Sequence, residues 1–91
     1  METLTLTNGA EINLNYANAI SNGAGHKKIT VELYFNGVYK EFSYTTTDMC
    51  AYDEATELDG NEKQVALYEI ISSKIEDLIF DWIYEIDGTI C

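Results

Sequence analysis

The sequence predicts an α+β fold in which an antiparallel sheet of three or four strands packs against a long C-terminal α-helix. Alternating apolar residues flank an Asn-Gly pair at residues 8–9 and a second pair at residues 36–37, and a helical period runs from residue 61 to residue 87. The length of 91 residues and the hydrophobic content of 46% fit one folded domain, residues 1–91.

The first Asn-Gly pair predicts a hairpin with strands at residues 2–7 and 10–16. Apolar residues alternate at positions 4 and 6 before the pair and at positions 12, 14 and 16 after it. A three-residue loop, residues 7–9, pairs Leu4 with Ile12 and points all five side chains to one face. A left-handed Gly9 suits that loop. Residues 17–28, rich in Gly and Asn, are predicted to form a loop.

The second Asn-Gly pair predicts a hairpin with a two-residue turn that pairs Phe35 with Val38. In this register one face of the hairpin is apolar apart from Lys40, whose long stem can lie along apolar surface. The predicted core residues of this face are Ile29, Val31, Leu33, Phe35, Val38, Phe42 and Tyr44.

The opposite face of this hairpin places Tyr34 across from Tyr39 and Glu32 across from Glu41. Two glutamates directly opposite each other on neighbouring strands are unfavourable. This face is therefore a candidate for binding a partner that supplies the missing positive charge.

Residues 48–58 allow two interpretations. Thr47 or Asp48 could cap a short helix that buries Ala51, Ala55 and Leu58, or the segment could be an irregular acidic loop.

The C-terminal stretch predicts a helix from Asn61 to Asp87, about 39 Å long at 1.5 Å per residue. Asn61 and Gln64 have the spacing of a capping pair, and Gly88 is a natural stop. One arc of the helix is apolar and comprises Leu67, Tyr68, Ile71, Ile75, Leu78, Ile79, Trp82 and Ile86. The predicted core of the protein includes Val31, Leu33, Phe42, Leu67, Ile71, Ile75, Leu78, Ile79 and Trp82.

The charge is strongly negative and unevenly distributed. The chain has 16 acids, five lysines and no arginine, for a net charge of −11. Residues 1–47 hold four acids and three lysines, a net of −1, whereas residues 48–91 hold twelve acids and two lysines, a net of −10. Such a field repels nucleic acid, phosphate and anionic membranes and attracts cationic surfaces. A role in solubility alone is the alternative interpretation.

The outer side of the predicted helix carries a row of like charges. Asp77, Asp81 and Glu85 are four residues apart, and only Lys74 lies nearby in the sequence. Like charges at this spacing weaken a helix, so we interpret the row as a binding feature whose repulsion a basic partner relieves. The predicted partner-binding residues are Glu69, Glu76, Asp77, Phe80, Asp81 and Tyr84 on the helix and Glu32, Tyr34, Tyr39 and Glu41 on the hairpin. Alternatively, residues 48–58 cover the apolar members, or the face is simply solvated.

The residues needed for catalysis are scarce. His26 is the one histidine, in a Gly-rich loop, and Cys50 stands among acids, which disfavour a thiolate. No stretch has the spacing of a phosphate loop, a calcium loop or a zinc site. We therefore expect no enzymatic activity, no cofactor and no bound metal.

The sequence also predicts a cytoplasmic protein. Its two cysteines, Cys50 and Cys91, do not form a disulfide framework. The N-terminus lacks the pattern of a signal peptide, and no apolar run is long enough to span a bilayer.

The chain resembles small, acidic, phage-encoded inhibitors, above all the anti-CRISPR proteins. The features that resemble this group are the short length, the turns in TNGAEI and YFNGVY, the long helix NEKQVALYEIISSKIEDLIFDWIYEIDG and the acids outside. The resemblance implies an inhibitor without catalytic activity in the host cytoplasm. It would bind a basic surface, such as the nucleic-acid site of a CRISPR effector, by imitating DNA, and would not itself bind nucleic acid or membranes.

Two other classes fit the same size and charge. One is an immunity protein or antitoxin that neutralises a basic nuclease. The other is a structural or assembly protein whose exposed apolar residues mediate oligomerisation, so both a monomer and a homodimer agree with the sequence.

Overall fold

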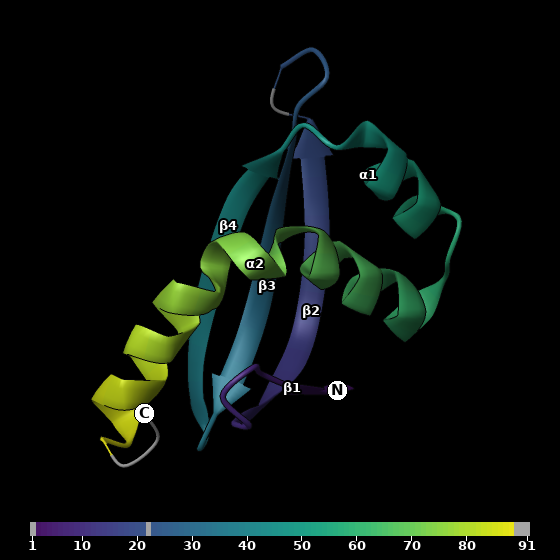
Figure 1. Ribbon diagram of the computed structural model, residues 1–91. Helices are drawn as coiled ribbons and strands as arrows, with labels where there is room; N and C mark the ends of the chain where they lie inside the picture. The colour runs from purple at the N-terminus through teal and green to yellow at the C-terminus, as the bar shows by residue number, and fades with distance from the viewer. Residues whose placement is uncertain (1, 22, 89–91) are drawn as a thin grey trace.

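The protein has two layers, a four-stranded antiparallel sheet and two helices that cover one face of it (Figure 1). The computed structural model describes residues 2–21 and 23–88, so Cys91 lies outside the described residues. The sheet order is β1-β2-β3-β4, with β1 Glu2–Thr5, β2 Glu11–Ser21, β3 Lys27–Phe35 and β4 Val38–Thr46. The helices are α1 Met49–Thr56 and α2 Gly60–Ile86. The predicted α+β fold, with its long C-terminal helix, is confirmed.

The β1–β2 hairpin has the predicted three-residue connection. Leu4 pairs with Ile12, and the Leu6 amide donates to the Ala10 carbonyl at 2.8 Å. Gly9 adopts a positive φ of 88°, and its amide donates to the Leu6 carbonyl at 2.9 Å. Glycine adopts this conformation without steric cost, which is why the turn and its register could be predicted.

The second half of β2 differs from the prediction. The strand continues to Ser21, although residues 17–28 were expected to form a loop. A register shift between Leu14 and Tyr16 also interrupts the alternation. One extra residue reverses the face of every following side chain. Ala17 is therefore buried, and Tyr16, expected on the core side, is 45% exposed on the outer face.

The β3–β4 hairpin has the predicted register. Asn36 and Gly37 have φ angles of 51° and 78°, and the pairing runs from Phe35↔Val38 to Ile29↔Tyr44. Val38 and Tyr44 are nevertheless 41% and 43% exposed, so their placement in the core was wrong. They lie on the edge strand of the sheet, towards its two ends. Phe42 between them is buried and packs on Trp82, with ring centroids 5.6 Å apart.

The segment after the sheet forms the short helix α1, which decides between the two interpretations of residues 48–58. The Asp48 carboxylate caps it by accepting a hydrogen bond of 3.1 Å from the Ala51 amide. Ala55 is buried, whereas Leu58 after the helix is 38% exposed.

Helix α2 begins at Gly60, so the predicted cap at Asn61 was wrong. Asp59 occupies the N-cap position in an extended conformation without a side-chain cap hydrogen bond, and Gly60 has a φ of 61°. The chain thus turns into the helix at a glycine, one residue before Asn61. The helix ends at Ile86, where the Asp87 amide donates to the Ile83 carbonyl at 2.8 Å.

Helix α2 bends near its middle and then runs towards the lower end of β4 (Figure 1). The Ser72–Ser73 pair is at the middle of the helix in sequence, and the Ser72 hydroxyl donates to the Glu69 carbonyl at 3.1 Å. Serine pairs and hydroxyls that bond back to the preceding turn are recognised causes of helix bending.

The bend changes which side chains of α2 face the sheet. Leu78 lies between Leu67 and Ile71 in a straight helical projection, yet it is 53% exposed, so its predicted place in the core was wrong. Ile83, absent from the predicted core, is buried instead. The buried residues of α2 are Leu67, Tyr68, Ile71, Ile75, Ile79, Trp82 and Ile83. Val31, Leu33 and Phe42 of the sheet are buried as predicted.

Replacement of Ile71 by Ala should lower the free energy of unfolding by about 2 to 5 kcal/mol, because it leaves a cavity at a residue that is 1% exposed. Leu78→Ala is the matched control on the same helix and should cost about 1 kcal/mol or less. Urea denaturation measures both. Equal losses would contradict the orientation of the helix.

Candidate protein-binding surfaces

The ten predicted partner-binding residues lie on two opposite sides of the molecule. Glu69, Glu76, Asp77, Phe80, Asp81 and Tyr84 belong to α2, whereas Glu32, Tyr34, Tyr39 and Glu41 lie on the sheet face that the helices leave uncovered. The helices lie in front of the sheet in Figure 1, and this face is behind it. One flat partner surface therefore cannot contact both groups at once.

The charge is concentrated in the helical layer. Residues 48–91, with their net charge of −10, supply both helices, and residues 1–47, with a net charge of −1, supply the whole sheet. A cationic partner is therefore attracted towards the side of the molecule that α1 and α2 cover.

The acidic row, defined as Asp77, Asp81 and Glu85, is exposed. None of these three carboxylates forms a hydrogen bond or an ion pair with any residue in the described ranges. Successive members are about 6 Å apart along the helix axis. The row is thus a regular line of negative charges that are available to a partner.

The positive charge of Lys40 lies near two carboxylates of the acidic row. A shallow groove between β4 and α2 is lined by Lys40, Phe42, Leu78, Asp81, Trp82 and Glu85. The lysine thus shares a groove with two members of the row, although only Lys74 was expected nearby. Asp77 does not line the groove, and Lys74, three residues before it on the helix, is its neighbouring lysine.

Glu76 and Phe80 are less accessible than predicted. The Glu76 carboxylate is half-buried and accepts a hydrogen bond of 2.9 Å from the Thr7 hydroxyl in the β1–β2 turn. Phe80 is half-buried against the hydrophobic core, and Ile70 is half-buried in a hollow between α1 and α2. Tyr84, 54% exposed, is therefore the aromatic residue of α2 that a partner can contact most fully.

Tyr68 is buried beneath the acidic side of α2. Burial raises its pKa to about 12, and the negative charges of Glu76 and Glu69 add to the effect. The phenol thus stays neutral throughout the physiological range.

The sheet patch, defined as Tyr16, Glu32, Tyr34, Tyr39 and Glu41, lies on the uncovered face. Glu32 is paired with Tyr16 on one side and with Glu41 on the other, and Tyr34 is paired with Tyr39. The two paired tyrosine rings have centroids 5.4 Å apart and planes inclined at 58°. Tyr16 was missed because its position depends on the register shift, for which the sequence has no clear signal.

The negative charges of the two glutamates in the sheet patch are partly compensated by neighbouring polar groups. The Asn15 amide donates to the Glu32 carboxylate at 3.1 Å. Desolvation and the charges of Glu32 and Glu41 raise the pKa of Tyr39 to about 12. This patch is more tyrosine-rich and less negative than the acidic row, and tyrosine is enriched in protein interfaces.

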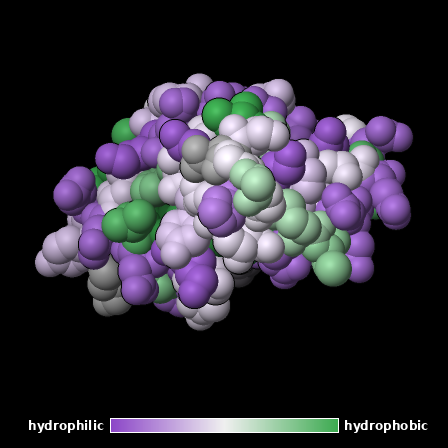
Figure 2. All heavy atoms as spheres, turned by 90° about the horizontal axis from the view of Figure 1, so that it is seen from above, coloured by the Kyte–Doolittle hydropathy of each residue, from purple (hydrophilic) through white to green (hydrophobic). Residues whose placement is uncertain are grey.

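His26 and Cys50, the candidate catalytic side chains, are both exposed. No group of three or more His, Cys, Asp or Glu side chains within residues 2–21 and 23–88 could hold a metal ion. In the same residues, no helix is long and apolar enough to cross a membrane. Viewed from above, the molecule is largely hydrophilic, with separate hydrophobic spots (Figure 2).

Comparisons with protein-family models, with curated proteins and with solved structures gave no match.

The raised pKa of Tyr68 predicts a loss of stability at alkaline pH. The unfolded chain releases the phenol proton near pH 10, whereas the folded protein holds it until about pH 12. The free energy of unfolding should therefore fall as the pH rises from about 10 to about 12. Urea denaturation across this range should show a shallower fall for Tyr68→Phe than for the wild type. The same slope in both proteins would contradict the burial of the phenol.

Proposed function

We propose that this protein is a non-enzymatic inhibitor that binds a lysine- and arginine-rich surface of another protein and excludes nucleic acid from it. The observation that supports the proposal is the exposed, unpaired acidic row on a helical layer with a net charge of −10.

The spacing of the row suits a surface built for phosphates. Its members are about 6 Å apart along the axis, which is comparable with the distance between neighbouring phosphates on a nucleic-acid strand. A groove that binds a nucleic-acid backbone through regularly placed lysines and arginines could pair with successive carboxylates in the same way. The exposed ring of Tyr84 would add apolar contact beside these charges.

The proposed partner is a host defence effector, such as a CRISPR effector, in the host cytoplasm. This assignment rests on the resemblance to small acidic anti-CRISPR proteins, some of which imitate DNA. The chain would act by occupying the site, with no reaction and no cofactor. Long-range attraction would accelerate the encounter and make it sensitive to salt.

Replacing Asp77 and Asp81 together by Asn should weaken partner binding about tenfold or more, because both charges would face lysines or arginines of the partner. The fold should be unchanged or slightly more stable, because a like-charge pair at this spacing destabilises a helix by about 0.2–0.5 kcal/mol. The immobilised wild type should capture a protein from a nuclease-treated host lysate. Added duplex DNA or high salt should release that protein.

The matched control is Asp53→Asn with Glu57→Gln, which removes the same charge from exposed residues of α1 and its C-cap. This control should retain the partner. If the partner binds both double variants as tightly as the wild type, or if DNA does not compete, the proposal is wrong.

Homo-oligomeric assembly is a second candidate function, which the edge strand β4 favours. Val38, Tyr44 and Leu78 are 41%, 43% and 53% exposed along the side where β4 meets α2. A second copy could pack its own side chains against this side and cover these residues.

Size-exclusion chromatography with light scattering should detect a dimer if this second function holds. Leu78→Glu should then convert the dimer to a monomer, because it places a charge in the apolar interface. Wild-type protein that is monomeric at all accessible concentrations would exclude assembly through β4.

A further inference from the structure

Strand β2 has an open edge over its second half. The neighbouring strand β1 pairs with residues 11–14 only, whereas β2 continues to Ser21. Residues 16–21 therefore have β3 on one side and, among the residues that the structure describes, no strand on the other. An unpaired edge of this kind is where an additional strand can join a sheet.

The β3–β4 turn determines which backbone groups point towards β2. In a hairpin with a two-residue loop, the flanking residues Phe35 and Val38 exchange both backbone hydrogen bonds. The backbone N–H and C=O groups of alternate β3 residues then point towards β4. Those of the residues between them, including Thr30 and Glu32, point towards β2.

The same alternation fixes the open edge of β2. Tyr16 and Asn18 of β2 pair with Glu32 and Thr30 of β3. The backbone groups of Tyr16 and Asn18 therefore point towards β3. The backbone groups of Ala17 and Ala19 therefore point away from the sheet. No residue of the described ranges forms a hydrogen bond with them on that side.

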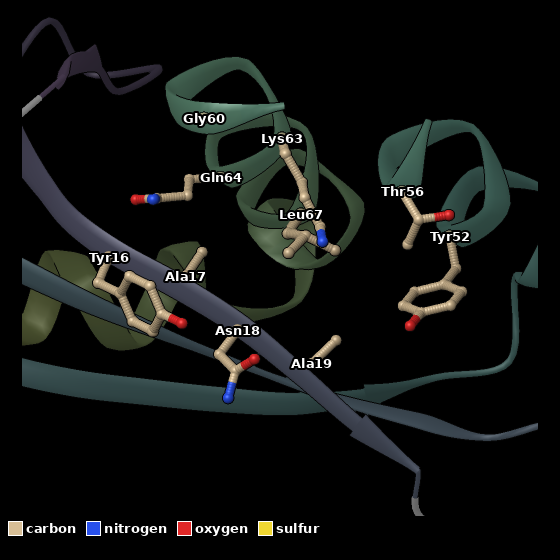
Figure 3. Close-up of a pocket in the computed structure, with 10 residues that line it drawn as sticks. All are labelled: Tyr16, Ala17, Asn18, Ala19, Tyr52, Thr56, Gly60, Lys63, Gln64 and Leu67. Atoms are coloured by element: carbon tan, nitrogen blue, oxygen red, sulfur yellow. The ribbon is translucent and has the colours of Figure 1, made fainter. Parts of the chain in front are cut away.

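The helical layer forms one wall of a cavity beside this edge. The cavity has a volume of about 220 Å³ and lies between β2, α1 and the first turns of α2 (Figure 3). Ala17 and Ala19 point from β2 towards the helices, and their small side chains leave space there (Figure 3). The polar side chains that the helices contribute are those of Tyr52, Thr56, Lys63 and Gln64.

We propose that an extended segment of a partner protein joins the sheet beside residues 17–21 of β2 and places a carboxylate side chain in the cavity at Lys63. The segment would supply backbone partners for Ala17 and Ala19, as in other cases of strand addition. Its side chains on the outer face would cover Tyr16 and Ile20, which are 45% and 55% exposed.

The charge of the cavity argues for a carboxylate. Lys63 is the charged residue of its lining, is half-buried, and has no ion pair among the residues that the structure describes. A second positive charge lies close by, because the Lys27 amine is 5.2 Å from the centre of the Tyr52 ring. The Tyr52 hydroxyl and the Gln64 amide are further donors in the lining, whereas the Thr56 hydroxyl already donates to the Asp53 carbonyl at 2.9 Å.

The other edge of the sheet is less suited to strand addition by a partner peptide. Strand β4 carries Lys40 and Glu41 at its centre, and charged residues on an edge strand oppose pairing with another chain. The open part of β2 has the uncharged residues Ala17, Asn18 and Ala19 instead. This proposal involves neither the acidic row nor a basic partner surface, so it stands or falls separately from the proposed function.

A titration with short peptides, followed by the amide resonances of the labelled protein, tests the proposal. The probe is the peptide acetyl-Thr-Val-Glu-Val-Thr-amide, compared with the same peptide carrying Lys in place of Glu. The Glu peptide should shift the amide resonances of residues 17–21 and bind about fivefold or more tightly than the Lys peptide. Lys63→Gln should remove this preference, and Lys74→Gln, which removes an exposed lysine elsewhere on α2, should leave it unchanged.

Backbone methylation of the probe identifies strand addition without any change to the protein. Successive amides of a strand point in opposite directions, so N-methylation of one alternating set should abolish binding and N-methylation of the other should be tolerated. Equal effects of both sets, or an absence of shifts in residues 17–21, would overturn the proposal. Equally strong binding of free succinate would identify a small-anion site and would also overturn it.

Discussion

The packing of α2 against one face of the sheet is the interaction on which the other features of the structure depend. Ile71, Ile75 and Ile79 are almost fully buried, and the Trp82 ring lies edge-on to Phe35 and Phe42, with centroids 6.3 Å and 5.6 Å away. A domain of 91 residues has enough chain for one helical layer, and such a layer covers only one sheet face. The opposite face is therefore left open. Both candidate surfaces, the acidic row and the sheet patch, follow from this one-sided packing.

Features of the fold that depend on residues next to each other in the sequence could be predicted. Features that depend on a departure from ideal helix or strand periodicity could not. The turn at Asn36 and Gly37 fixes the β3–β4 register, because few other residues adopt its two positive φ angles. The errors at Tyr16 and Leu78 have a different origin. One extra residue in β2 reverses the side-chain alternation, and a bend in α2 rotates the buried face. A strict period of 2.0 or 3.6 residues includes neither the extra residue nor the bend.

The exposure of the charged residues on the candidate surfaces could be predicted from the sequence. The positions of these residues relative to other strands and helices could not. The acidic row follows directly from helical spacing, so its exposure could be expected. The proximity of Lys40 to Asp81 could not, because it depends on how α2 crosses β4. The open edge of β2 was beyond prediction for a similar reason. It requires that β1 end early, that β2 continue to Ser21 and that α1 form beside it, and the sequence left the last of these undecided.

The distribution of charge supports the proposed binding role of the acids. Excess charge that serves solubility has no need to be concentrated on one layer, yet ten of the eleven net negative charges belong to residues 48–91. Stability does not explain this concentration either, because unpaired like charges along a helix reduce it. In the same strongly acidic half of the chain, the half-buried Lys63 lines a cavity without an ion pair among the described residues. A partly desolvated lysine is unfavourable unless a negative group compensates it. The helical layer thus attracts cations over its outer surface, while the cavity beside β2 favours an anion. Two sites of opposite preference on one small domain are more consistent with the binding of specific partners than with a uniformly solvated surface.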